Sequence, residues 1–496
     1  MTESMLLLLA LIIPLAGGLL LAMQSSANTR DAISLVTASL LFVVVLSLYP
    51  YVLSGTAATY TLAEPIKGLS FSLQAEPLGL MFATIASGLW ILTTIYGMGY
   101  MRGNNETNQT RFFLCFALSI SAVMGIAFAG NLITLFVFYE MLTLATYPLV
   151  THKGNEEARR GGRIYLGILM FTSIGFLLMA TLWTYSLSGT LDFKAGGILQ
   201  GHVSPALALV LLTLFAFGTG KAALMPFHRW LPSAMVAPTP VSALLHAVAV
   251  VKAGVFTILK ITIYIFGIDL IAVTGAGTIA LWVATFTLTA ASLVALTKNN
   301  LKARLAYSTV GQLSYVIVGA MLANAAGIVG AAMQIAMHAM GKITLFFCAG
   351  AIYVATHKTE ITDMRGLGYK MPFTFAAFFI GSISIIGLPP LGGSWAKWYL
   401  LMGSIDASQW IIVGALLLSS LLNIAYLIPI SARAFYSVPD KQNSGAGNTV
   451  AEAPMLCVVP LCITAAGSIL LFFFGDSLNQ FISLIPLRAP DNVVVQ

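Results

Sequence analysis

The stretch GKAALMPFHRWLP, residues 220–232, decides the fold because it interrupts an apolar segment with a lysine and two prolines. A proline removes a backbone donor and clashes with the preceding turn, so we expect a helix to break here. A second stretch, GLPPLGGSWAKW at residues 387–398, also combines prolines with a lysine. Broken backbone at membrane depth is tolerated only where protein or a water-filled cavity satisfies it. The two stretches predict two discontinuous helices around a polar interior.

The composition places these interruptions in a membrane protein. Of 496 residues, 58% are hydrophobic and 8% are charged, and the mean hydropathy is +0.92. These values exclude a soluble globular domain. We expect an all-α polytopic membrane protein with about fourteen transmembrane helices, because apolar runs of spanning length recur along the chain. The expected spans are residues 4–23, 31–53, 77–101, 110–129, 131–150, 162–187, 205–231, 240–266, 274–297, 304–323, 326–355, 372–402, 409–435 and 452–475.

The spacing of the interruptions predicts an internal repeat. They fall in the seventh and twelfth spans, and an odd offset of five helices reverses the direction of the chain across the membrane. This is the signature of an inverted repeat, with functional groups near the midplane. The predicted units are a three-helix segment (1–109), a first repeat of spans 4–8 (110–266), an inverted second repeat of spans 9–13 (267–436), and a C-terminal helix and tail (437–496). Ordinary proline kinks are the alternative, and the lysine beside each break weighs against it.

The basic residues predict the orientation. Sixteen lie in the odd-numbered loops and three in the even-numbered loops and tails, namely Lys67, Lys194 and Arg488. By the positive-inside rule the odd loops are cytoplasmic and both termini face outward. The net charge of +7 then reflects topology and contact with anionic lipid, and no nucleic-acid partner is needed.

Neither a cofactor nor a metal is predicted. The four cysteines, Cys115, Cys348, Cys457 and Cys462, form no disulfide framework and no metal-binding spacing. His152, His228 and His357 also lack such spacing. A Gly-rich nucleotide loop and a haem ligand pair are missing from the sequence. Any redox chemistry would therefore belong to partner subunits.

Titratable side chains inside the apolar runs are the functional candidates. A lysine at the bilayer centre costs roughly 2.5–3.5 kcal/mol on insertion scales, so a chain that keeps several must use most of them. Transport of protons or cations is the obvious use. The set comprises Glu140, Lys221, His246, Lys252, Lys260, His338, Lys342 and Lys397.

These candidates differ in their settings. His338 and Lys342 are four residues apart, so on a helix they share a face and can exchange a proton directly or through one water. Lys260 lies near the outer end of its span, and we expect it to anchor that end at the interface. His246 and His228 are weaker candidates. A packing role for His246 stays open, and His228 lies in the turn after the first break.

Four separated motifs resemble the proton-conducting antiporter-like subunits that are shared by Mrp-type cation/proton antiporters, respiratory complex I and membrane-bound hydrogenases. The motifs are Tyr139-Glu140, the stretch from Lys221 to Lys252 with PFHRWLP and APTPVSALLH, His338 to Lys342, and Gly387-Leu388-Pro389 through Lys397. They cover spans 4–13 in the family's order. The span number and the chain length are most similar to the D-type Mrp subunit.

The resemblance implies roles for the relay residues. Glu140 would pair with Lys221 as a switch of proton affinity. Lys252 would carry protons at the centre, and Lys397 would release them on the outer side. In this hypothesis protons enter from the cytoplasm near Lys221 and Lys252 and cross by way of His338 and Lys342. The reverse direction is equally compatible.

Three functions remain open from the sequence. The chain is a subunit of a multisubunit sodium/proton antiporter, a pumping subunit of a complex I-like or hydrogenase assembly, or a non-conducting scaffold. The overall length and the lysine at position 397 favour the antiporter, a secondary transporter rather than an enzyme. The scaffold is least favoured because each titratable position is filled. All three interpretations imply other membrane subunits as partners and a bacterial or archaeal cytoplasmic membrane.

Overall fold

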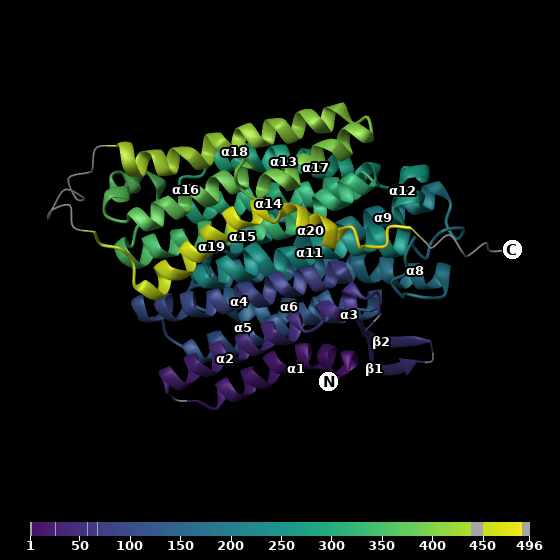
Figure 1. Cartoon of the computed structure of the whole chain (residues 1–496), viewed down its shortest axis with the longest axis horizontal. Helices are drawn as coiled ribbons and strands as arrows, with labels where there is room; N and C mark the ends of the chain where they lie inside the picture. Colours follow the sequence, from purple (N-terminus) through teal and green to yellow (C-terminus); the bar gives the residue numbers. More distant parts are fainter. Residues whose placement is uncertain (1, 25, 57, 67, 438–449, 489–496) are drawn as a thin grey trace.

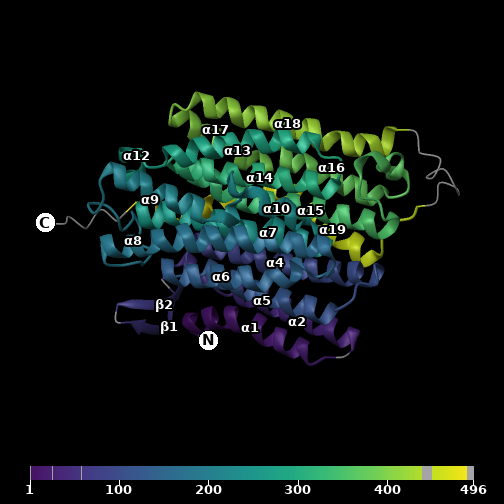
Figure 2. The same cartoon turned by 180° about the vertical axis from the view of Figure 1, so that it is seen from behind.

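The computed structural model describes residues 2–24, 26–56, 58–66, 68–437 and 450–488. Within this part of the chain nearly all regular structure is helical, and most helices run roughly along the long axis of the molecule (Figures 1 and 2). The expected fold class, an all-α bundle of membrane-spanning helices, is confirmed. Eleven described helices are long and apolar enough to cross a membrane.

The elements of the first half begin with three helices and a small hairpin. They are α1 (Glu3–Ala22), α2 (Ala27–Leu46), α3 (Tyr49–Leu53), β1 (Thr59–Ile66), β2 (Leu69–Gln74), α4 (Pro77–Gly103), α5 (Gln109–Ala127), α6 (Leu132–Val150), α7 (Glu156–Thr172), α8 (Met179–Ser188), α9 (Pro205–Gly218), α10 (Trp230–Ser233) and α11 (Val250–Lys260). Short 3-10 and π segments join them: η1 (Ser173–Leu178), η2 (Gly220–Ala222), η3 (Phe227–Arg229), η4 (Ala234–Val236), η5 (Val241–Ala249) and η6 (Ile261–Phe266).

The second half adds nine further helices among the described residues. They are α12 (Ile268–Thr274), α13 (Thr278–Thr297), α14 (Leu301–Met321), α15 (Ala325–Thr356), α16 (Pro372–Ile386), α17 (Gly393–Asp406), α18 (Trp410–Tyr436), α19 (Met455–Phe473) and α20 (Gly475–Ile482), with 3-10 turns η7 (Ile361–Met364) and η8 (Leu367–Tyr369) before α16.

Both predicted helix breaks are present. The seventh span ends as a helix at Gly218 and continues through η2 and η3, and the twelfth is divided into α16 and α17 by residues 387–392. Because each break shortens its helix, α9 and α16 are only 14 and 15 residues long. The count of about fourteen spans, the residue boundaries of the four units and their inversion stay predictions.

Asparagine side chains start several helices. The side chain of Asn131 accepts the backbone N–H of Thr134 and thereby caps α6. The same three-residue spacing is found at the starts of α7, α14 and α15. Such a cap satisfies a backbone donor that the first turn would leave unpaired. The caps therefore fix where helices begin at both ends of the bundle.

The β-hairpin was not expected from the sequence. Strand β1 pairs antiparallel with β2, from Thr59 opposite Gln74 to Ile66 opposite Leu69, with two irregularities in the register. It projects from one end of the bundle, the end that also carries α8 and α12 (Figure 1). We call this the hairpin end, and the opposite end, which carries the α4–α5 and α6–α7 connections, the loop end.

The two ends of the described chain both lie at the hairpin end. The Ser4 hydroxyl donates to the carbonyl of Thr59 in β1, and Arg488 forms an ion pair of 3.3 Å with Asp269 of α12. This fits termini that share one side of the membrane. Lys67 and Lys441, which contributed to the charge count, lie outside the described residues.

The core of the bundle is built around α11 and α15. All eleven residues of α11 are buried, and α15 buries 24 of its 32 residues. Helices near the periphery instead expose large apolar side chains, such as Leu19, Val36 and Leu421. A surface that faces lipid tails can expose large apolar side chains, because these side chains contact hydrocarbon there and not water. The polar groups that remain inside must therefore find partners in the protein.

Candidate functional site

Lys221 lies in the break of the seventh span and is fully buried. Its ammonium donates to the carbonyl of Tyr139 (2.7 Å) and to the hydroxyl of Thr143 (2.6 Å), both on α6. It also lies 3.2 Å from the centre of the Tyr139 ring, a cation–π contact. The Tyr139 hydroxyl accepts the backbone N–H of Lys221. Helix α6 thus supplies the partners that the broken backbone lacks.

Close approach of α11 to the break depends on one glycine. A Cβ on Gly254 would lie 2.3 Å from the backbone nitrogen of Ala222. At the break itself Ala223 adopts a left-handed conformation with φ of +54°, and the indole of Trp230 donates to the carbonyl of Gly220. The unwound turn is therefore held on one side by α11 and on the other by α6 and Trp230.

The predicted pair of Glu140 and Lys221 is not closed in this conformation. Of the ion pairs among the described residues, none joins these two side chains. Both carboxylate oxygens of Glu140 are buried and without a hydrogen-bond partner. Neighbouring residues on a helix point in different directions, and the Lys221 ammonium is taken up by the Tyr139 carbonyl and Thr143 instead.

Lys252 and His338 meet at the centre of the bundle. Lys252 Nζ on α11 lies 2.5 Å from His338 Nδ1 on α15, and both side chains are buried. A bond between these atoms requires one donor and one lone pair, so a single proton lies between them. His338 Nε2 is buried without a partner. The sequence expectation paired His338 with Lys342, whereas the structure joins it to Lys252.

Lys342 is directed toward α14 and α18. Its ammonium donates to the hydroxyl of Ser308 (2.7 Å). The Tyr426 hydroxyl lies 2.8 Å from Ser308 Oγ and 2.5 Å from Asn423 Oδ1. The amide nitrogen of Asn423 is buried without a partner. Lys342 therefore begins a chain of hydroxyl and amide groups that extends onto α18.

Lys397, on α17, also contacts α18. Its ammonium donates to the carbonyl of Ile386 (2.8 Å) and to the Ser420 hydroxyl (2.9 Å), and it lies 4.7 Å from the ring centre of Tyr315. Gly387, with φ of +86°, lets the stem of this lysine pass: a Cβ there would lie 2.5 Å from Lys397 Cδ. The second break thus exposes a carbonyl that the lysine uses.

The contribution of α18 was not expected from the sequence. Ser420, Asn423 and Tyr426 recur at intervals of three residues, so each lies next to the following one along the surface of the helix. The signal is present in the sequence as SSLLNIAY, residues 419–426, within an otherwise apolar span. It is inconspicuous because none of these side chains is charged.

The two weaker histidine candidates are placed differently. His246, on η5, is fully buried between the rings of Tyr165 and Trp230, at 6.2 Å from each, and neither ring nitrogen has a partner. π-Helical segments such as η5 are frequent at functional sites. His228 is only partly buried in η3, near Tyr307. His246 therefore lies inside the bundle and His228 at its margin.

The expectation that Lys260 anchors an interface is wrong. Its side chain is 1% exposed. The ammonium donates to the carbonyl of Ala129 (2.7 Å) and forms an ion pair of 3.4 Å with Glu76. Because these two oxygens lie on the inner side of the helix, the lysine turns inward rather than toward the membrane surface.

The four relay lysines share one property. Among the described residues, every ion pair within 4.0 Å involves other side chains, so the direct hydrogen-bond partners of Lys221, Lys252, Lys342 and Lys397 are all neutral. Within the described part of the chain, only Lys221 of the four also interacts with a carboxylate, that of Glu140, at longer range. Uncompensated buried charge is costly, which makes loss of the proton easier. The arrangement suits groups that take up and release protons.

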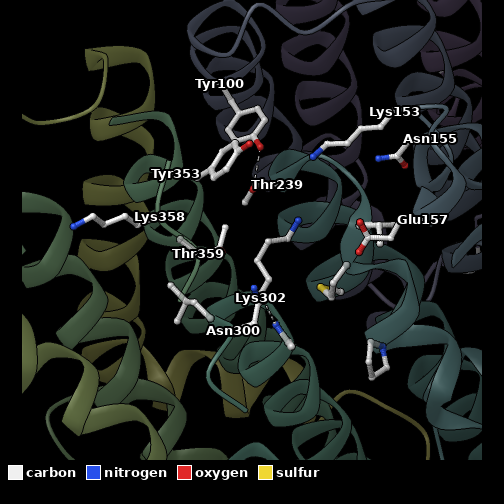
Figure 3. A pocket seen from close by; sticks show the side chains of 16 residues that line it. Tyr100, Lys153, Asn155, Glu157, Thr239, Asn300, Lys302, Tyr353, Lys358 and Thr359 are labelled. Atoms are coloured by element: carbon white, nitrogen blue, oxygen red, sulfur yellow. Dashed lines mark hydrogen bonds between the residues drawn. The ribbon is translucent and has the colours of Figure 1, made fainter. Parts of the chain in front are cut away.

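A cavity of about 390 Å³ opens at the loop end. Figure 3 shows Lys153 and Lys302 reaching into this space, with Glu157 near them. Lys302 also donates to the carbonyl of Ala237, just before η5, and Thr239 of the lining donates to the Tyr100 hydroxyl. The cavity therefore reaches the start of the segment that carries His246.

In the described ranges no group of three His, Cys, Asp or Glu side chains could hold a metal ion.

Residues 129–423 match a family described as NADH:quinone oxidoreductase/Mrp antiporter, transmembrane. This match covers both breaks and every relay residue. The chain belongs to this family. The resemblance expected from the four motifs is thus confirmed, and the protein is a multi-pass, antiporter-like membrane subunit.

Curated relatives of this family differ in how much of their length the chain covers. It is 30% identical over 442 residues to NADH-quinone oxidoreductase subunit N of Desulforudis audaxviator, covering 83% of this chain and 85% of the relative. It is 32% identical over 403 residues to a probable K(+)/H(+) antiporter protein of Rhizobium meliloti, covering 78% of this chain but 38% of the relative. Chain 5 of an NAD(P)H-quinone oxidoreductase from Synechocystis, 31% identical over 366 residues, is covered over 52% of its length. The chain thus spans about half or less of the last two.

Two solved structures share the fold. A chain of the Mrp complex from Dietzia sp. superposes with a TM-score of 0.86 at 20% identity, covering 98% of this chain and 97% of that chain. A chain of the membrane-bound sulfane sulfur reductase, an archaeal respiratory membrane complex, gives the same TM-score and identity and is covered over 98%. One architecture therefore occurs both in an Mrp complex and in a respiratory complex.

Proposed function

We propose that the chain moves protons as one subunit of a multisubunit monovalent cation (Na⁺)/proton antiporter in a bacterial or archaeal inner membrane. Other membrane subunits of that assembly are its partners, as they are for the relatives in the Mrp complex. The path runs from Lys221 and Lys252 through His338 and Lys342 to Lys397.

The observation that carries this proposal is the contact between Lys252 and His338. These two buried nitrogen bases lie 2.5 Å apart, and no ion pair among the described residues brings a carboxylate to the lysine, so the two can share one proton. Whichever base loses the proton becomes a neutral acceptor for the next one. His338 Nε2 has no partner among the described residues and is free to pass a proton toward the second half of the molecule.

The polar side chains of α18, namely Ser420, Asn423 and Tyr426, support the remainder of the path. Ser308 and Tyr426 carry hydroxyl groups that both donate and accept, so they can pass a proton from Lys342. Ser420, three residues before Asn423 on α18, contacts Lys397. The unpaired amide of Asn423 between them is a place where water would find a donor.

The loop-end cavity is the proposed entrance from the cytoplasm. It reaches the residues before η5, and His246 lies on that segment with both nitrogens unpaired. The placement of basic residues favours a cytoplasmic loop end and termini that face outward. Lys397 is the exit in this scheme.

Glu140 is the proposed switch, and the conformation described is its open state. The Lys221 ammonium contacts the Tyr139 carbonyl, one residue from Glu140, so a change of side-chain rotamer could transfer it to the carboxylate. Pairing would stabilise the charged lysine, and separation would favour release of its proton. The equilibrium between the two states would set the proton affinity of the relay.

Replacement of Lys221 or Glu140 tests the scheme. Lys221→Ala and Glu140→Ala should each abolish proton flux in membrane vesicles that contain the whole assembly, while the assembled complex stays in the membrane. Arg160→Ala, an exposed position on α7, is the control and should keep full flux. Full activity in both test variants would refute the relay.

A pumping subunit of a redox-driven complex is the second candidate. The extensive match to NADH-quinone oxidoreductase subunit N favours it, since that relative is covered over most of its length. Visible absorption of the purified assembly separates the two. Iron–sulfur or flavin bands would support the redox complex, and their absence together with Na⁺-dependent proton flux would support the antiporter.

A further inference from the structure

The ion pair of Lys260 and Glu76 is a second buried titratable group outside the relay. Lys260 ends α11, and Glu76 precedes α4, so the pair joins two helices at the hairpin end. The Lys260 ammonium also lies 4.4 Å from the ring centre of Phe193. The relay from Lys221 to Lys397 does not use this pair.

Every oxygen of Glu76 has two partners. Oε1 accepts the backbone N–H of Gly79 and faces Lys260, and Oε2 accepts the N–H of Leu78 and the hydroxyl of Tyr264 at 2.5 Å. The carboxylate therefore caps α4 and at the same time connects a lysine with a tyrosine. Such a set of adjoining donors and acceptors can relay a proton.

Glu76 of this pair borders a cavity of about 370 Å³ at the hairpin end. Glu76, Tyr264 and Phe193 line this cavity together with Thr56, Gln74 and Leu484, whereas Lys260 does not. The Glu76 carboxylate thus stands between the lysine and the space that water can enter. Its side chain is 11% exposed, against 1% for Lys260.

Helix α11 links this pair to the relay. Lys252 and Lys260 are eight residues apart, about 12 Å and just over two turns along a helix, so their side chains leave α11 at directions roughly 80° apart. The π segments η5 and η6 flank α11 on both sides. The relay centre and the hairpin-end cavity therefore lie at the two ends of one short, buried helix.

We propose that Lys260, Glu76 and Tyr264 form a proton port on the outer side within the first repeat, in addition to the exit at Lys397. This inference rests on the proposed proton transport. In the port, Lys260 gives one proton by way of Glu76 to water in the cavity. Lys260 then accepts a proton that has left the Lys252 ammonium through intervening water. The net change is one proton moved from Lys252 to the cavity, and the charges of Lys260 and Glu76 are restored.

An arginine at position 260 separates a port from a static ion pair. Lys260→Arg keeps the positive charge opposite Glu76, but a guanidinium cannot be deprotonated in a protein. Proton flux of the complete assembly in vesicles should fall about twofold in both Lys260→Arg and Lys260→Met, because one of two parallel exits loses its proton-transfer group while Lys397 still conducts. Unchanged flux in a folded Lys260→Arg variant would overturn the port.

A second pair of variants leaves the buried lysine untouched. Thr56→Trp places a large side chain at the cavity lining and should reduce flux by up to about twofold, because the parallel exit at Lys397 stays open. Thr61→Trp, on the exposed β1 strand of the hairpin, is the matched control and should transport normally. Normal transport by Thr56→Trp would also overturn the port. Lys252→Ala in the same vesicles tests the proposed function itself. If Lys252→Ala loses proton flux while the Lys260 and Thr56 variants keep it, the port is refuted and the proposed proton transport stands.

Discussion

Two lysines on α11 have different partners. Lys252 contacts a neutral base, His338, whereas Lys260, two turns farther along, contacts the carboxylate of Glu76. Both are buried on the same helix. A neutral partner leaves the ammonium without charge compensation, while a carboxylate stabilises it. The contrast shows that burial alone does not assign a role to a membrane lysine, because the partner decides how firmly its proton is held.

Removal of Lys252 should give the largest effect. Lys252→Met eliminates the base that shares a proton with His338, and we expect proton flux to fall about 1,000-fold, within the range for loss of a proton-transfer group. Stability should not fall, because an uncompensated buried charge is removed. Flux in vesicles and thermal unfolding of the purified assembly measure the two effects. Thr257→Ala is the control, since that hydroxyl bonds only within α11. If Lys252→Met keeps its proton flux, the argument that Lys252 carries protons because its partner is neutral is contradicted.

Removal of the carboxylate beside Lys260 should make it resemble Lys252. Glu76→Gln leaves a buried ammonium without its anion and should destabilise the protein by about 3 kcal/mol, as expected when one partner of a buried ion pair is lost. Thermal unfolding of the purified assembly measures this change. Glu64→Gln, on the exposed hairpin, is the control and should unfold like the wild type. An unchanged unfolding temperature in Glu76→Gln would mean that the pair contributes nothing to stability.

A carboxylate at position 338 should make Lys252 resemble Lys260. In His338→Asp the lysine gains an anion and loses the base that shares its proton. Because its proton is then held more tightly, flux should fall about tenfold, which corresponds to a barrier increase of about 1.4 kcal/mol. His338→Asn, a neutral side chain of similar size to Asp, is the comparison. Flux in His338→Asp that exceeds flux in His338→Asn would contradict the argument that charge compensation holds the proton.

Much of the fold is predictable from the chain because its signals are local. Apolar runs of spanning length predict the helical bundle, and prolines beside glycines predict the breaks after Gly218 and Gly387. The hairpin at residues 59–74 was not expected; most of β1 is exposed, whereas β2 is half-buried. The Lys221 and Lys397 sites stand out because charge within an apolar run is conspicuous, whereas uncharged Asn423 and Tyr426 do not.

Partners could not be predicted, because they depend on distances between segments far apart in the chain. The sequence suggested that His338 would act with Lys342, four residues away, and that Glu140 would pair with Lys221. In the structure Lys252, 86 positions before His338, takes that contact, and Lys221 is bound by the Tyr139 carbonyl.

The sequence by itself determined which side chains are placed in the membrane, because hydropathy and helix-breaking residues act within single segments. Only the tertiary structure decided which of them share a proton, which have a counter-ion, and which face a cavity. Lys260 is the clearest case: its position near the end of a span predicted an anchor, and packing of α11 against α4 placed it opposite Glu76 instead. Electrostatic interactions fall off with distance, so only the folded chain sets them.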